Sequence, residues 1–180
     1  MSEIRIYENM ANNLVFTSNN PQKIHEQLAL VGVRFEQWQT QSTVQAGDSS
    51  EHVMAAYQAD IDRLISEDGY QTVDVISLTA DHPQKDELRQ KFLSEHTHSE
   101  DEVRFFVAGQ GLFSLHIGER VYEVLCTAGD LISVPANTPH WFDMGPNPAF
   151  VAIRFFNNPD GWVAHFTGSD IAEHYNRLTA

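Results

Sequence analysis

The chain has 180 residues, of which 42% are hydrophobic and 11% aromatic, so it is long enough to bury a core of its own. Its formal net charge of −14 argues against nucleic acid or an anionic membrane as a partner. There is no apolar run of membrane-spanning length, and the first residues do not resemble a signal peptide. Cys126 is the only cysteine, so no internal disulfide is possible; we expect a cytoplasmic protein and a buried strand thiol.

The first ninety residues predict short strands that alternate with helices. Asn20 and Pro21 predict the start of a helix that continues to about residue 31 and stops at Gly32. A second helix is predicted over residues 50–66, because apolar residues recur on one face before Gly69 ends it. A short charged helix is expected over residues 83–92. Strands are predicted at residues 4–8, 14–17, 33–38 and 73–78.

From residue 102 onward, short strands follow one another at glycine-containing turns. They are predicted at residues 103–107, 112–117, 121–125, 131–134, 140–142 and 149–156. This spacing is typical of a small antiparallel barrel or jelly roll. We therefore expect a mainly β protein with α elements (α+β), organised as one domain over 1–180. Its parts are N-terminal strands and helices (1–90), a barrel (91–168) and a C-terminal helix (169–180).

Four residues have the spacing of a mononuclear metal site: His96, His98, Glu102 and His140. His96 and His98 are two residues apart, so on a strand they point to one face, with their Cα atoms roughly 6–7 Å apart. Glu102 would lie about 13 Å beyond His98 on a straight strand, so the polar residues 99–101 must form a bend. His140 follows a proline-rich turn and comes from a separate strand.

Imidazole and carboxylate ligands together suit a borderline first-row metal such as iron, nickel, manganese or zinc. Three histidines and one carboxylate leave two positions of an octahedral ion for other ligands. A lone histidine is usually structural, and we interpret the remaining histidines in that way: His25, His52, His82, His116, His165 and His174.

These residues resemble the two sequence motifs of the cupin superfamily. The first motif is matched by His96, His98, Glu102 and Gly109, with Gln90 in place of its leading glycine. The second is matched by Gly129, Pro135 and His140, with Asn137 in place of a glycine and Met144 in place of an asparagine. Asparagine tolerates a left-handed backbone, so we expect the turn at Asn137 to be retained.

Several stretches taken together resemble one cupin family, acireductone dioxygenase, over nearly the whole chain. They are Phe92-Leu93, Glu95-His96-Thr97-His98, Asp101-Glu102-Val103-Arg104-Phe105, Ser133-Val134-Pro135, Thr138-Pro139-His140-Trp141-Phe142-Asp143 and Phe166-Thr167-Gly168. The resemblance implies one Fe(II) or Ni(II) per chain and cleavage of 1,2-dihydroxy-3-keto-5-methylthiopentene by O2 in methionine salvage. It further implies that the iron form yields formate and 2-keto-4-methylthiobutyrate. The nickel form is implied to yield formate, carbon monoxide and 3-methylthiopropionate.

Such a substrate would react as an anion, so an acidic chain needs local positive charge near the ligands. Arg104 is two residues after Glu102 and shares its strand face, although it could instead pair with Glu100 or Asp101. Arg154 lies within an apolar strand and could bind the same anion or face solvent.

Other nearby residues are candidates for the tail pocket and for proton transfer. For the methylthio tail we expect an apolar wall from Phe92, Phe105, Phe142 and Trp162, although aromatic residues are more often plain core. Asp101 is the candidate general base, with a turn-stabilising carboxylate as the alternative. Glu95 should point away from the ligands, which suggests that it orients a ligand or assists metal entry.

Two other functions remain open at this stage. One is a zinc or manganese isomerase of the sugar-phosphate type, which should need more lysine and arginine near the ligands than the sequence offers. The other is a small-molecule-binding or sensor cupin, although the chain has no room for a separate DNA-binding domain. The sequence does not fix the oligomeric state, and a monomer is compatible with it.

Overall fold

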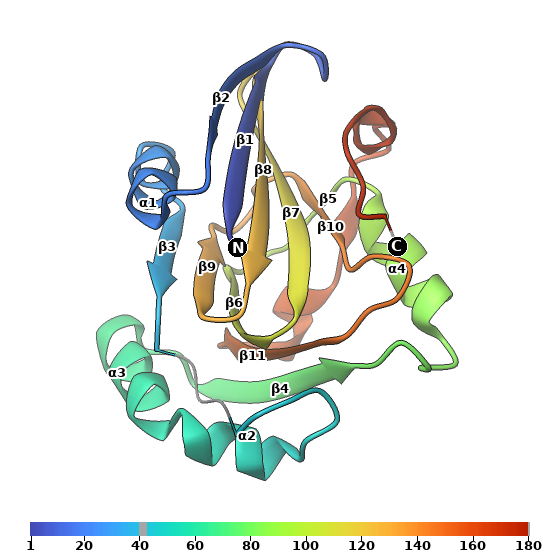
Figure 1. Cartoon of the computed structure of the whole chain (residues 1–180). Helices are drawn as coiled ribbons and strands as arrows, with labels where there is room; N and C mark the ends of the chain where they lie inside the picture. Colours follow the sequence, from blue (N-terminus) through green and yellow to red (C-terminus); the bar gives the residue numbers. More distant parts are fainter. Residues whose placement is uncertain (40–42, 180) are drawn as a thin grey trace.

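The computed structural model describes residues 1–39 and 43–179, and two antiparallel sheets form its barrel (Figure 1). The seven-stranded sheet has the spatial order β12 (His165–Phe166), β5 (His96–Thr97), β10 (His140–Asp143), β7 (Gln110–Ile117), β8 (Arg120–Thr127), β1 (Glu3–Glu8) and β2 (Leu14–Ser18). The five-stranded sheet has the order β3 (Arg34–Gln37), β9 (Asp130–Val134), β6 (Glu102–Ala108), β11 (Phe150–Phe156) and β4 (Thr72–Leu78). This architecture confirms the predicted α+β class and the antiparallel barrel.

Four helices lie outside the barrel in the described ranges: α1 (Pro21–Ala29), α2 (Ser50–Ala56), α3 (Gln58–Asp68) and α4 (Lys85–Leu93). The side chain of Asn20 caps α1 by accepting a hydrogen bond of 2.9 Å from the backbone N–H of Gln22, as predicted. Gly69 ends α3 with a left-handed backbone (φ 74°), also as predicted.

The predicted second helix is in fact two helices, because the backbone turns at Tyr57 (φ −116°). Tyr57 is fully buried, and its ring packs edge-on against Phe105 with 5.0 Å between the centroids. Packing at this position coincides with the break, which the continuous apolar stripe of the sequence did not reveal.

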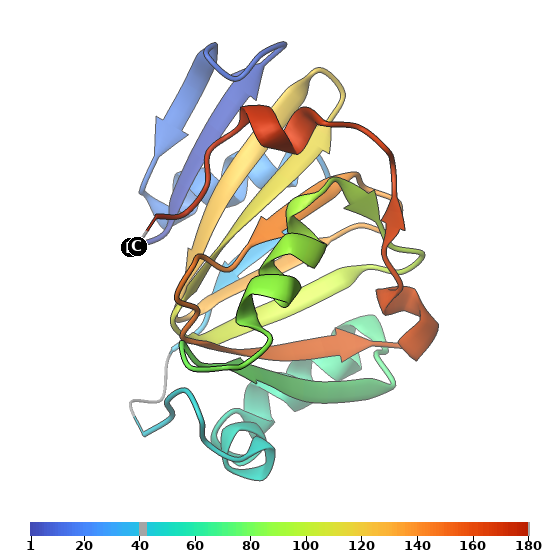
Figure 2. The ribbon, with the colours of Figure 1, turned by 90° about the vertical axis from the view of Figure 1, so that its right-hand side faces the viewer.

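The predicted C-terminal helix is wrong: residues 171–174 form only one short 3₁₀ turn, η2 (Ile171–His174). Beyond this turn, side chains rather than helix carbonyls take up backbone N–H groups. The N–H of Asn176 donates to Glu123 (3.0 Å) and the N–H of Leu178 donates to Asp143 (2.8 Å). Glu123 and Asp143 are buried in the barrel, and their hydrogen bonds hold residues 175–179, the C-terminal segment, extended against it. Figure 2 shows the chain following one side of the barrel before η2 crosses the seven-stranded sheet.

The two faces of the five-stranded sheet pack against different partners. Its inner face joins the barrel core, which contains Phe106, Phe113 and Ile132. Its outer face is covered by α2 and α3 and forms a second core with Phe105 and Ile153. No helix within residues 1–39 and 43–179 is long and apolar enough to cross a membrane.

Candidate functional site

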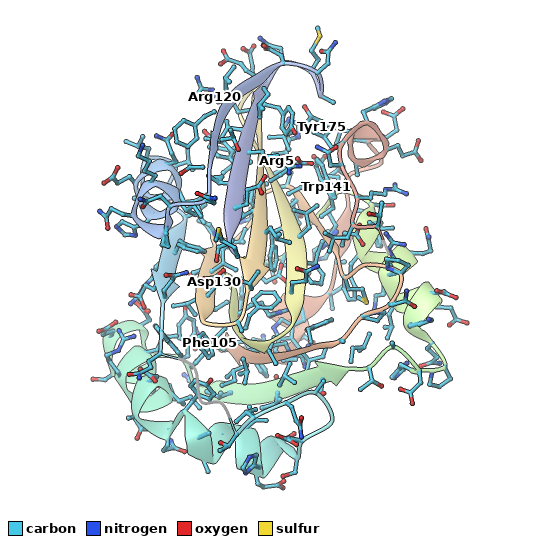
Figure 3. The ribbon with its side chains drawn as sticks, in the orientation of Figure 1. Arg5, Phe105, Arg120, Asp130, Trp141 and Tyr175 are labelled. Carbon is cyan, nitrogen blue, oxygen red and sulfur yellow. The ribbon has the colours of Figure 1, made fainter. Side chains whose placement is uncertain are left out.

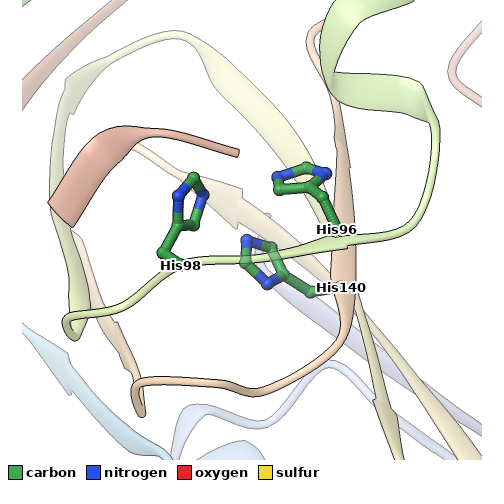
Figure 4. A group of neighbouring side chains, drawn as sticks. All are labelled: His96, His98 and His140. Carbon is green, nitrogen blue, oxygen red and sulfur yellow. The ribbon is translucent and has the colours of Figure 1, made fainter. Parts of the chain in front are cut away.

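Three histidine side chains converge inside the barrel (Figure 4). His96 lies in β5 directly opposite His140 in β10, and His98 follows β5 by one residue. All three are buried, and one ring nitrogen from each lies within 4.8 Å of the others. As the spacing predicted, His96 and His98 point to the same side of the chain.

The second nitrogen of each ring points away from this centre and meets a backbone carbonyl oxygen. The Nδ1–O distances are 2.7 Å from His96 to Ser94, 2.8 Å from His140 to Thr138 and 3.2 Å from His98 to Val163. A carbonyl oxygen only accepts hydrogen bonds, so each Nδ1 must carry a proton. Each imidazole is thereby oriented with Nε2 toward the centre, which is the arrangement that metal-ligating histidines commonly have.

Glu102 reaches the same centre from the opposite sheet. The chain bends at residues 99 and 100, and β6 then starts at Glu102, as predicted from the spacing. One carboxylate oxygen, Oε2, lies 2.6 Å from Nε2 of His140 and 3.3 Å from Nε2 of His98. The centre therefore contains three imidazoles and one carboxylate.

The charge states at this centre depend on neighbouring charges as well as on burial. Burial, together with the neighbouring His140, lowers the pKa of His96 to about 4, so this imidazole is neutral at pH 7. Burial also opposes ionisation of Glu102, but Arg104 and His140 outweigh it and hold the Glu102 pKa well below its usual range. For His140, burial opposes the charged form, but the nearby Glu102 outweighs burial and raises the His140 pKa above its usual value. A neutral imidazole and an ionised carboxylate are the forms in which these groups bind metals.

The centre borders a cavity, which His96 and Glu102 help to line. Residues two apart on a strand share a face, so the side chains that line the cavity can be followed along each strand. Along β6, Glu102 and Arg104 are followed on that face by Phe106; along β11, Arg154 is followed by Ala152 and Phe150. The cavity therefore has a charged end at the candidate metal centre and an apolar end farther along the strands.

Both predicted arginines line the charged end. Nη2 of Arg104 lies 3.0 Å from Oε1 of Glu102, so Arg104 pairs with Glu102 instead of with Glu100 or Asp101. Arg154 does not simply face solvent: its Nε and Nη2 donate to Asp74 in β4 at 2.8 and 2.7 Å. Sequence reasoning missed Asp74, because only the pairing of β11 with β4 places it opposite Arg154.

The four aromatic residues expected to form the apolar wall lie in different places. Phe92 and Phe142 line the cavity. Phe105, which is labelled in Figure 3, does not: it lies in the second core. Its ring is stacked on that of Trp38, with 4.3 Å between the ring centroids. Phe105 is three residues after Glu102 on β6, so its side chain lies on the opposite face of the strand. Phe106 shares the face of Glu102 and lines the cavity in its place. Trp162 does not line the cavity either. Its ring packs against the guanidinium of Arg154, 3.6 Å from the ring centroid.

The three acids beside the ligands have different partners. Glu95 is buried and points away from the centre, where its two oxygens accept hydrogen bonds from Thr167 and His116, both at 2.7 Å. Glu100 accepts from the backbone N–H groups of residues 157 and 158. Asp101 is exposed and accepts from the N–H of Ala136 at 2.9 Å, which is the turn-stabilising contact.

Comparison with known proteins gives a consistent result. Residues 3–164 match the family model described as the ARD/ARD' family. The chain is 70% identical over 151 residues to an acireductone dioxygenase of Alcanivorax borkumensis, a match that covers 84% of this chain and 83% of that protein. It is 61% identical over 166 residues to the acireductone dioxygenase of Klebsiella oxytoca, with 92% of each chain covered.

A solved structure supports the same relationship. The acireductone dioxygenase from Bacillus anthracis, determined with a cadmium ion in its active centre, superposes with a TM-score of 0.80 at 33% identity. The superposition covers 92% of this chain and 98% of that one. On these matches in sequence and structure, this chain belongs to the ARD/ARD' family of acireductone dioxygenases.

Proposed function

We propose that this protein is a metal-dependent dioxygenase that uses O2 to cleave 1,2-dihydroxy-3-keto-5-methylthiopentene in methionine salvage. The observation that carries the proposal is the two-ended cavity, which joins candidate metal ligands and two arginines to an apolar slot. The substrate has the same two halves, because its enediol ionises while its methylthio tail is apolar. We further expect it to act in the cytoplasm as a single chain, without nucleic acid or membrane partners.

We propose that His96, His98, Glu102 and His140 hold one Fe(II) or Ni(II) per chain. The donor set supports a borderline first-row metal, and the fixed Nδ1 protons leave the Nε2 atoms available as ligands. When bound, the metal would supply a Lewis acid that holds the enediol oxygens and favours their ionised form. The Nε2 proton that His140 shares with Glu102 would leave as the metal binds.

The two arginines are proposed to bind the anionic half of the substrate. Arg104 is 16% exposed and Arg154 20% exposed, so hydrogen bonds to either guanidinium form largely out of water. Asp74 on one side and Trp162 on the other fix the orientation of Arg154. Arg104 also lies beside Glu102, so we propose it as the residue that stabilises the dianion close to the metal.

Asp101 is proposed as the general base. Both oxygens of Glu95 accept hydrogen bonds from side chains, and Glu100 binds two backbone N–H groups. Asp101 binds the N–H of Ala136 through Oδ1, and the second oxygen, Oδ2, is the one we assign to proton transfer. Phe92 and Phe142, together with Phe106, are proposed to contact the methylthio tail.

Replacing a proposed ligand should remove the metal. We expect His140→Ala to bind metal at least about 100-fold more weakly, because loss of a mere outer-shell partner already costs 10–100-fold. The matched control is His25→Ala, since His25 also contacts a backbone carbonyl (Phe35) but lies outside the cluster of three histidines. Elemental analysis after dialysis measures both variants, and normal metal content in His140→Ala would exclude that residue from the site.

The identity of the metal should decide the products. We expect apo-protein loaded with Fe(II) to give formate and 2-keto-4-methylthiobutyrate, and apo-protein loaded with Ni(II) to give formate, carbon monoxide and 3-methylthiopropionate. Nickel should bind at least as tightly as iron, because affinity rises along the first row toward copper. Product analysis with and without O2 tests this, because an isomerase would continue to work without oxygen. Identical products from both metals would contradict the proposed chemistry at its most specific point.

Arg104→Ala should impair turnover far more than Arg120→Ala. A hydrogen bond to a charged group contributes about 1.5–3 kcal/mol, so kcat/KM should fall by between roughly 10- and 150-fold. Arg120 is the matched control, since it also pairs with a carboxylate, Glu8, but at the exposed surface. Arg104→Lys should restore only part of the loss, because an ammonium lacks the planar fork. Near-normal kinetics in Arg104→Ala, at full metal content, would move the anion-binding role to Arg154.

Removing the proposed base should separate turnover from metal content. We expect Asp101→Asn to keep its metal and lose about 100-fold or more of kcat, the usual contribution of a general base. Raising the pH should restore part of the activity, because the substrate then ionises unaided. Glu95→Gln should lower metal content with a milder loss per bound metal. Kinetics normalised to metal decide the matter, and full activity of Asp101→Asn at neutral pH would show that another carboxylate is the base.

A further inference from the structure

Gly111 in β7 lies against the ring of Phe142, one of the aromatic side chains that line the apolar end of the cavity. A Cβ atom at Gly111 would lie 2.3 Å from Cε2 and 2.4 Å from Cζ of that ring, and 3.2 Å from Cε1 of Phe106. The backbone of Gly111 is outside the left-handed region, so its conformation does not call for glycine. The need for glycine at this position is therefore steric.

Strand register shows in which direction the ring points. In the pairing of β10 with β7, His140 lies opposite Leu115 and Phe142 lies opposite Phe113. Gly111 is two residues beyond Phe113 on the same face of β7, on the side away from His140. The ring of Phe142 therefore leans away from the candidate metal centre to reach Gly111. The same ring lines the cavity.

Three other aromatic rings lie beside that of Phe142. Its centroid lies 4.7 Å from that of Phe113, 6.1 Å from Phe150 and 6.5 Å from Phe106. A side chain at position 111 would project into the barrel interior. Since carbon atoms in contact stay about 3.5–4.0 Å apart, it would push the tip of the ring inward by more than about 1 Å. The ring would move toward the charged end and shorten the apolar end.

We propose that Gly111 determines the length of apolar tail that the cavity accepts, through the position of the Phe142 ring. This inference rests on the proposed function, since it assigns the apolar end to the tail of an enediol substrate. Gly111 is a positioning residue: it makes room for the aromatic side chain that contacts the tail. The ligand class is an enediol ketone whose apolar chain is no longer than the slot between the charged end and Phe142.

The test compares two acireductones, one with the methylthioethyl tail and one with a methyl group in its place. For Gly111→Ala we expect KM for the long-tailed substrate to rise roughly 10-fold, the lower end of what one methylene is worth in an apolar pocket. Its kcat, its metal content and its kinetics with the short-tailed substrate should stay within about twofold of the unmodified protein. Leu112→Ala is the matched control, because Leu112 is the next residue of β7 and lines a different, outer surface hollow. Any loss in Leu112→Ala should be equal for the two substrates. Equal losses for the two substrates in Gly111→Ala would overturn the proposal.

A second variant separates a specific displacement from general damage. Phe142→Leu shortens the side chain that the new methyl group would push, so adding Gly111→Ala to it should change the ratio of long-tail to short-tail kcat/KM little. The two substitutions should thus be strongly non-additive. Additive effects would overturn the proposal. If Gly111→Ala alone does not fold, comparing the double variant with Phe142→Leu gives the same decision.

Different measurements test the proposed function and the steric inference. If the unmodified metal-loaded protein turns over neither acireductone in the presence of O2, the proposed function is wrong. Crystal structures of the unmodified protein and of Gly111→Ala then decide the steric inference without any substrate. We expect the Phe142 ring to be displaced toward His140. A ring that stays in place beside Ala at position 111 overturns the inference whichever way the activity assay comes out.

Discussion

Three backbone carbonyl groups hold the imidazoles of the candidate metal centre, and the rest of the site depends on them. Two of these contacts are local, because Ser94 and Thr138 each lie two residues before the histidine that they bind. The third links His98 to Val163, 65 residues away in sequence. The centre therefore needs residues 157–167, which follow β11, as well as the strands that carry the histidines. Glu95 and Glu100 strengthen that link, since they bind Thr167 and the backbone N–H groups of residues 157 and 158.

Two oppositely charged side chains at the candidate metal centre are largely buried. Glu102 and Arg104 stand beside each other on β6 with side chains only 9% and 16% exposed. Burying either charge alone would be costly, and removing one partner of a buried pair typically costs about 3–5 kcal/mol. Mutual pairing makes the arrangement tolerable, and Arg154 is held in a similar way by Asp74. A preorganised pair of guanidinium groups beside a metal centre is well suited to an anion, because little reorganisation is needed when it binds.

Local patterns predicted most elements of the fold, and they failed where a distant contact decided. The cap at Asn20, the stop at Gly69 and the left-handed Asn137 (φ 63°) follow from the chemistry of those residues and appear as expected. The break at Tyr57 and the extended C-terminal segment do not follow from any local signal. Both depend on partners far along the chain: Phe105 for Tyr57, and the buried carboxylates Glu123 and Asp143 for the C-terminal segment.

The sequence by itself determined the candidate donor set, because His96 and His98 share a face of a strand and Glu102 can join them only after a bend. Strand alternation could also have shown that Phe106 shares the face of Glu102 while Phe105 does not. Only the tertiary structure decided which residues surround these ligands. The partner of Arg154, the acceptor for His98 and the contact between Gly111 and Phe142 each join segments that are remote in sequence. Such contacts depend on how strands pair and which side chains meet inside the barrel, and no local pattern of residues encodes that.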